Sequence, residues 1–187
     1  MKENANIFLL RIFWVFLLIL NIFMIALVMP QGTERILSAA DNPESASLLD
    51  VQVFGFDKTK AWSILNAMGE DGRRQYAVFA MREDLVFPLA YGLFCGVTLF
   101  SLAVKRFRAK FPVMLIFPAL AVFADFAENF FIVLLIRQFP ELLNSTMQFA
   151  SLANMIKWGS VALSLGLMAA FLVLLVIQGK TRQRTLR

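Results

Sequence analysis

Two acidic residues one helical turn apart, Asp125 and Glu128, lie beside Asn129 in the middle of a long apolar segment. A charged side chain near the centre of a bilayer costs at least ~2.5 kcal/mol to insert, so carboxylates at such positions usually serve a function. A lysine, Lys157, interrupts the next apolar segment. Carboxylates and an amine in one apolar setting can bind a proton, a cation or a small polar headgroup, and they can also catalyse acid–base reactions.

Composition identifies the class of protein that has to position these residues. Hydrophobic residues make up 59% of the chain, well above the ~45–50% of soluble domains. A membrane-spanning helix needs about 20 mostly apolar residues. Four stretches satisfy this requirement: residues 7–29, 85–104, 112–136 and 149–177. The sequence therefore predicts an all-α polytopic membrane protein, in which residues 1–187 form one domain built as a four-transmembrane-helix bundle.

The first apolar stretch could instead be a cleaved signal peptide. Its apolar run is about twice as long as a typical signal-peptide core, and residues 28–31 lack the small-x-small cleavage pattern. We therefore expect a retained membrane helix.

Basic residues predict the orientation in the membrane. Residues 105–110 and the tail after residue 177 carry several Lys and Arg residues and no acid, which is typical of cytoplasmic flanks. We therefore expect a multi-pass protein of the cell (inner) membrane, with both termini cytoplasmic and residues 30–83 extracytoplasmic. Because the net positive charge is concentrated in these flanks, we expect anionic membrane lipid as a partner and no nucleic acid.

The chain contains one cysteine, Cys95, and no histidine. A disulfide within the chain is therefore excluded, and zinc sites and histidine-ligated haem lack their usual ligands. Copper or haem binding by methionine stays formally open, but the nine methionines are scattered. We expect no metal site and no cofactor.

Residues 30–83 are expected to form a small, partly helical extracytoplasmic segment that covers the outer mouth of the bundle. Residues 31–49 are rich in Ser, Ala, Asn and Asp, which favours irregular or weakly helical structure, and residues 49–54 are expected to form a short extended piece. Asp57 suits the N-cap of a helix that stops at Gly69. A further helix is expected to run from there into the second span.

Helix geometry predicts that all four spans contribute polar groups to one layer. At 1.5 Å per residue, Glu128 and Lys157 both lie about 12 Å inside the outer ends of their spans. Asn21 and Tyr91 lie about 10–12 Å inside theirs, and Asp125 lies deeper, at about 16 Å. The shared depth and the short connection between spans predict that Glu128 and Lys157 pair directly. Asp125 is then the group expected to titrate or to receive a ligand.

The helical spacing of these polar residues predicts faces that converge inside the bundle, because polar groups that faced lipid would lack partners. Arginines near the outer mouth could also reach inward. The candidate binding residues are Asn21, Arg73, Asp84, Tyr91, Asp125, Glu128, Asn129 and Lys157. No catalytic residue is assigned.

Gly92 and Gly96 form a GxxxG motif in the second span, which lets a neighbouring helix approach closely. Packing inside the bundle explains such a motif more often than dimerisation does. The sequence does not decide whether the chain also forms an oligomer through this motif.

Several short motifs of the chain resemble those of small four-span bacterial integral membrane proteins that have no established activity. The similar positions are residues 69–76, then Asp84, Pro88 and Tyr91, the D-x-x-E-N motif of residues 125–129, and Lys157 with Trp158. The resemblance covers roughly the last two thirds of the chain. It implies a four-helix membrane fold and the same candidate positions, and it implies no substrate.

Three functions are open. The polar layer could bind a proton, a cation or a small polar or lipid headgroup. It could instead be the acid–base site of an enzyme that acts on a lipid or isoprenoid substrate, or a structural ion-pair network in a structural or assembly subunit. A cavity that opens sideways to lipid would favour the enzyme, and a cavity that opens to outer solvent would favour ion or solute binding.

Overall fold

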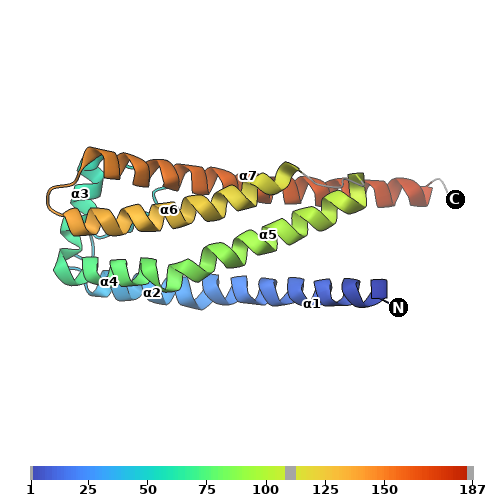
Figure 1. Ribbon diagram of the computed structural model, residues 1–187, viewed down its shortest axis with the longest axis horizontal. Coiled ribbons are helices and arrows are strands. Elements are labelled where there is room, and N and C mark those ends of the chain that lie inside the picture. The colour runs from blue at the N-terminus through green and yellow to red at the C-terminus, as the bar shows by residue number, and fades with distance from the viewer. Residues whose placement is uncertain (1, 108–112, 185–187) are drawn as a thin grey trace.

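The computed structural model describes residues 2–107 and 113–184, which form helices and no strand. Four long helical rods form one bundle, and both termini lie at the same end of this bundle (Figure 1). Each rod is long and apolar enough to cross a membrane, and the four candidate spans are Phe8–Ser38, Gly69–Ala103, Val113–Gln138 and Asn144–Ile177. Each overlaps a predicted span, and the first two extend into residues 30–38 and 69–84, beyond the predicted bounds. The all-α, four-span fold is confirmed. We call the end with both termini the terminal end and the opposite end the cap end.

The first rod is one continuous helical stretch. It consists of α1 (Lys2–Phe23), a π-helical segment (Met24–Val28) and α2 (Met29–Ser38). The expectation of irregular or weakly helical structure from residue 31 is therefore wrong for residues 31–38. Pro30 lies in the first turn of α2, where a missing N–H is tolerated, and the wider turns just before it shift the hydrogen-bond ladder. The helical stretch therefore continues through Pro30 and does not end there.

The cap end is formed by residues 39–57, which make turns, and by the short helix α3 (Lys58–Ala67). Asp57 accepts a hydrogen bond from the amide of Lys60 at 2.7 Å, which confirms the predicted N-cap. Gly69 has a φ of +63° and separates α3 from α4 (Gly69–Met81). A side chain at Gly69 would also collide with the carboxylate of Asp41, since a Cβ there would lie 2.2 Å from it. The expected extended piece at residues 49–54 is a series of turns instead.

The remaining helices are α5 (Glu83–Phe107), a short 3-10 turn (Val113–Leu115), α6 (Ile116–Gln138) and α7 (Asn144–Arg184). α4 leads into α5, which crosses the bundle obliquely from the side of α1 toward α7 (Figure 1). The predicted basic loop at residues 105–110, the predicted start of the third span at Pro112 and the end of the basic tail lie wholly or partly outside the described residues.

We call residues 39–67, the turns together with α3, the cap segment. One apolar core joins the cap segment to the helices that it packs against. Its buried members come from α2, the turns, α3, α4, α6, the α6–α7 connection and α7. They are Ile36, Leu48, Leu49, Phe56, Ala61, Ile64, Leu65, Met68, Tyr76, Phe79, Ile132, Leu135, Leu142 and Ala150. This core fixes the cap segment against the part of the bundle that carries the polar residues.

Candidate functional site

A buried ion pair joins α6 to α7 in the cap half of the bundle. The ammonium group of Lys157 bonds to the carboxylate of Glu128, and both side chains are buried, with Glu128 0% exposed. The two helices are antiparallel neighbours joined by a short connection, so positions similarly far from that connection lie opposite each other. The prediction that these residues are direct partners is confirmed. Among the described residues, none donates a hydrogen bond to Oε1 of Glu128.

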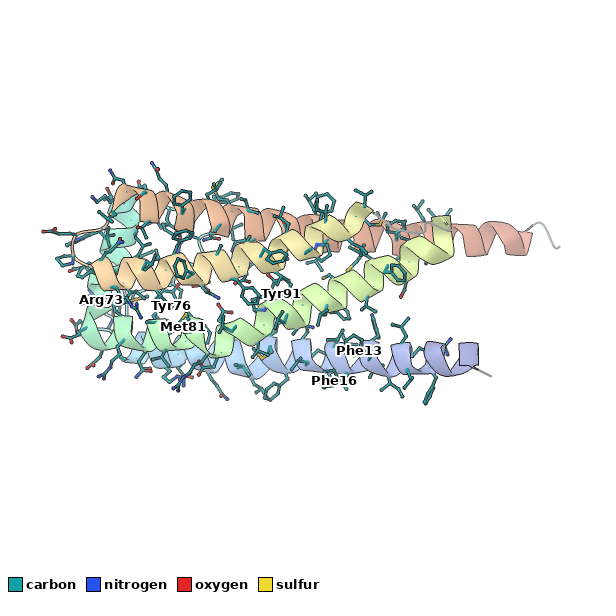
Figure 2. The ribbon with its side chains drawn as sticks, in the orientation of Figure 1. Phe13, Phe16, Arg73, Tyr76, Met81 and Tyr91 are labelled. Carbon is teal, nitrogen blue, oxygen red and sulfur yellow. The ribbon has the colours of Figure 1, made fainter. Side chains whose placement is uncertain are left out.

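Asp125 lies one turn nearer the terminal end of α6 and has different partners. The hydroxyl of Tyr91 donates to Oδ2 of Asp125 at 2.9 Å, and Nδ2 of Asn129 lies 3.4 Å from Oδ1. Tyr91 reaches across from α5 toward α6 (Figure 2). Both donors are neutral, and no ion pair of Asp125 is seen within the described parts of the chain.

A proline in α5 creates a second attachment for Asn129. Pro88 has no N–H, so the carbonyl of Asp84, four residues earlier, loses its usual helical donor. Nδ2 of Asn129 faces that carbonyl at 3.4 Å and so ties α6 to α5. The side chain of Asp84 is itself buried.

The sequence analysis missed a further charged residue, Asp50, which the cap segment brings to the same place. Its carbonyl accepts hydrogen bonds from the indole of Trp158 at 2.9 Å and from Lys157 at 3.4 Å, and its carboxylate accepts one from Tyr76 at 2.5 Å. The available signal was an acid within the apolar run of residues 48–54. This run is expected from the sequence to lie outside the membrane, where an acid is common.

We define the buried acidic cluster as the buried residues Asp84, Asp125, Glu128 and Lys157 together with Asp50, which is partly buried. The charges of these five residues interact with one another. With every group ionised, the cluster would carry three more negative than positive charges. Such an excess is unfavourable in a buried, weakly polar environment.

Among the described residues, the candidates Asn21 and Arg73 do not contact the buried acidic cluster. Nδ2 of Asn21 donates to the carbonyl of Ala90 at 3.0 Å and so joins α1 to α5. Arg73 lies toward the cap end (Figure 2), where it donates to the carbonyl of Leu65 at 2.8 Å and stacks 4.2 Å from the ring centre of Phe139. Their described partners are backbone groups and a ring, and not the carboxylates of the cluster.

Three hollows lie away from the cluster. An apolar cavity of about 400 Å³ lies between α1, α5 and α6, and another of about 780 Å³ lies between α1, α5 and α7. A polar hollow of about 700 Å³ lies beside α3. None of these three is lined by a residue of the buried acidic cluster.

Within the described residues, no three side chains of His, Cys, Asp or Glu are grouped so that they could hold a metal ion. No family model matches the sequence, and neither a curated protein nor a solved structure matches it significantly. The chemistry of the site therefore has to be argued from its own geometry, in which several carboxylates share one amine and several neutral donors.

Proposed function

We propose that this membrane protein binds a proton at the buried acidic cluster. The observation that carries the proposal is the presence of three buried carboxyl groups and one partly buried carboxyl group, that of Asp50, near a single amine, Lys157. A proton removes excess negative charge without needing the converging ligands of a metal site. A small monovalent cation is the alternative occupant, because it would neutralise the same charge.

Asp125 is the residue that we assign to the proton. The Tyr91 hydroxyl lies 2.9 Å from Oδ2 of Asp125 and 3.2 Å from the carbonyl of Ala121, yet it has only one proton to donate. With Asp125 ionised, Tyr91 donates to the carboxylate. With Asp125 protonated, the carboxyl group donates to the Tyr91 oxygen and Tyr91 donates to Ala121. Both protonation states are therefore satisfied by the same heavy-atom positions.

Protonation of Asp125 would affect the cap segment through Lys157. This ammonium group contacts Glu128 and the carbonyl of Asp50 at once, and its charge also interacts with Asp125. A change in the charge of Asp125 therefore changes the electrostatic balance around the group that links α6, α7 and the cap segment.

Infrared difference spectroscopy of the protein in lipid bilayers tests this proposal. We expect a carboxylic acid C=O band that appears as the pH is lowered, and that is missing from Asp125→Asn and shifted in Tyr91→Phe. The exposed Glu141→Gln is the matched control and should keep the band. Identical bands in Asp125→Asn and the unmodified protein would contradict the assignment. Loss of the band on adding Na⁺ or K⁺ at fixed pH would identify a competing cation.

The two other candidate functions make different predictions. A structural ion-pair network would show no carboxyl band that depends on pH. An enzyme acting on lipid would need an apolar cavity that reaches the carboxylates, and the two apolar cavities described above are lined by other residues.

We further propose that the protein lies in the cell (inner) membrane with both termini cytoplasmic, since the basic residues flank the terminal end of the bundle. The buried acidic cluster would then lie in the extracytoplasmic half, and anionic lipid would contact the basic flanks.

A further inference from the structure

The turn segment of residues 48–56 exposes apolar side chains that the fold leaves uncovered. Phe54 is 94% exposed, and its neighbours Val51 and Val53 are 50% and 43% exposed. The same segment contributes buried side chains to the apolar core, among them Leu49 and Phe56. The exposed residues therefore belong to a segment that is fixed in place.

The segment runs along α7 from the cap end toward the terminal end. The amide of Phe56 donates to Oγ of Ser151 at 2.9 Å, and the carbonyl of Asp50 accepts from Trp158. Ser151 and Trp158 are 7 and 14 residues from the start of α7 at Asn144, which corresponds to about 10 and 20 Å along the helix. The segment thus reaches the level of the Glu128–Lys157 ion pair.

The exposed surface of α7 at this level is apolar. Phe149, Leu152 and Met155 are all exposed, and they belong to the candidate span Asn144–Ile177. Gly55, with a φ of +80°, packs so tightly on α7 that a Cβ would lie 2.6 Å from the Ser151 hydroxyl. The apolar tip of the segment therefore continues the surface that α7 presents to its surroundings.

Side chains of the bundle and bonds inside the segment satisfy part of its irregular backbone. The amides of Leu49 and Asp50 donate to the Tyr76 hydroxyl at 3.1 and 3.2 Å. The carbonyl of Leu49 accepts from Asn154 at 2.9 Å, and that of Asp50 accepts from Trp158. Bonds inside the segment run from the amides of Gln52, Val53 and Gly55 to the carbonyls of Leu49, Val51 and Gln52. Irregular backbone at membrane depth needs such partners, because lipid offers no hydrogen bonds. Among the described residues, the amides of Val51 and Phe54 have no such partner.

We propose that residues 51–54 are embedded among the acyl chains of the membrane half nearer the cap end, with Phe54 as the anchor. Two observations support this occupant: the depth of the segment along α7 and its continuity with an apolar membrane-spanning surface. The inference does not depend on proton binding by the cluster.

Spin labelling of the full chain in phosphatidylcholine–phosphatidylglycerol vesicles tests the proposal. In a Cys95→Ala background, labels are placed at Phe54→Cys, at Leu152→Cys as a lipid-facing reference and at the exposed Thr59→Cys on α3 as the matched control. We expect the label at 54 to collide more with apolar O₂ than with a polar nickel chelate, as at 152, and the label at 59 to show the opposite preference.

Two results would overturn the proposal. A label at 54 that behaves like the one at 59 would place the segment in water, and a label shielded from both reagents would mean that protein covers it. Fluorescence of Phe54→Trp in the presence of brominated lipid provides a second measurement. Quenching no stronger than that of Thr59→Trp would reject the membrane position. Because residue 54 is almost fully exposed, neither substitution disturbs the core.

Discussion

The ammonium group of Lys157 contacts the carbonyl of Asp50 as well as the carboxylate of Glu128. One side chain on α7 therefore holds both α6 and the cap segment. Trp158, the next residue, donates to the same carbonyl of Asp50. The cap segment and the ion pair are consequently parts of one polar structure.

Removing one member of the ion pair should destabilise the fold strongly. Breaking a buried pair leaves an uncompensated charge and typically costs ~3–5 kcal/mol. We expect Glu128→Gln and Lys157→Met each to lower the thermal unfolding temperature of the protein in detergent. The double variant should recover part of the loss, whereas the exposed Lys60→Met should have little effect. Strictly additive losses in the double variant would count against direct pairing.

Tyr76 should hold the cap segment in place. Its hydroxyl accepts two backbone amides and donates to the Asp50 carboxylate. Leaving buried amides without an acceptor costs about 1–3 kcal/mol each. Tyr76→Phe should therefore speed hydrogen exchange at the amides of Leu49 and Asp50.

The other tyrosine of the chain provides the control for that experiment. Tyr91→Phe removes a hydroxyl that bonds to α6 instead of the cap segment. Exchange at residues 49 and 50 should stay slow in this variant. Equal protection in Tyr76→Phe and Tyr91→Phe would show that the hydroxyl of Tyr76 is not needed there.

The sequence predicts the four spans because their apolar runs are long and continuous. It also predicts the Glu128–Lys157 pair, because two antiparallel helices joined by a short connection bring equal depths together. Asp50 could not be assigned in this way, because its partners Tyr76 and Trp158 lie 26 and 108 residues away in sequence. No periodicity relates a turn segment to such distant helices.

The two glycines of the GxxxG motif should differ in their effects on stability. A Cβ at Gly92 would lie 2.1 Å from Cγ2 of Val122 on α6, whereas a Cβ at Gly96 meets no atom within 4 Å. Overpacking a close contact typically costs 1–3 kcal/mol. Gly92→Ala should therefore lower the unfolding temperature, and Gly96→Ala should leave it nearly unchanged.

The oligomeric state of the same variants tests whether the motif also joins two copies of the chain. A change of mass in Gly96→Ala, measured by light scattering with detergent correction, would assign Gly96 to an interface between chains. Equal destabilisation by both substitutions would contradict the distinction between the two glycines.

The orientation in the membrane can be tested with single cysteines in a Cys95→Ala background. We expect Ser45→Cys, an exposed position in the cap segment, to react with a membrane-impermeant maleimide in intact cells. Thr181→Cys should react only after the cells are permeabilised. Labelling of Thr181→Cys from outside would reverse the proposed orientation.

Asp125→Asn should separate stability from function. The amide oxygen of asparagine can still accept from Tyr91, and the substitution removes one of four carboxylates that share a single amine, so we expect the unfolding temperature to stay equal or rise. Proton uptake should fall by about one proton per chain, measured as the pH change of a weakly buffered solution on acid titration of the protein in nanodiscs. Lys157→Met is the contrasting variant, since it should unfold more easily because Glu128 loses its partner. If Asp125→Asn were as unstable as Lys157→Met, Asp125 would be a structural member of the ion network and its assignment as the proton-binding residue would fail.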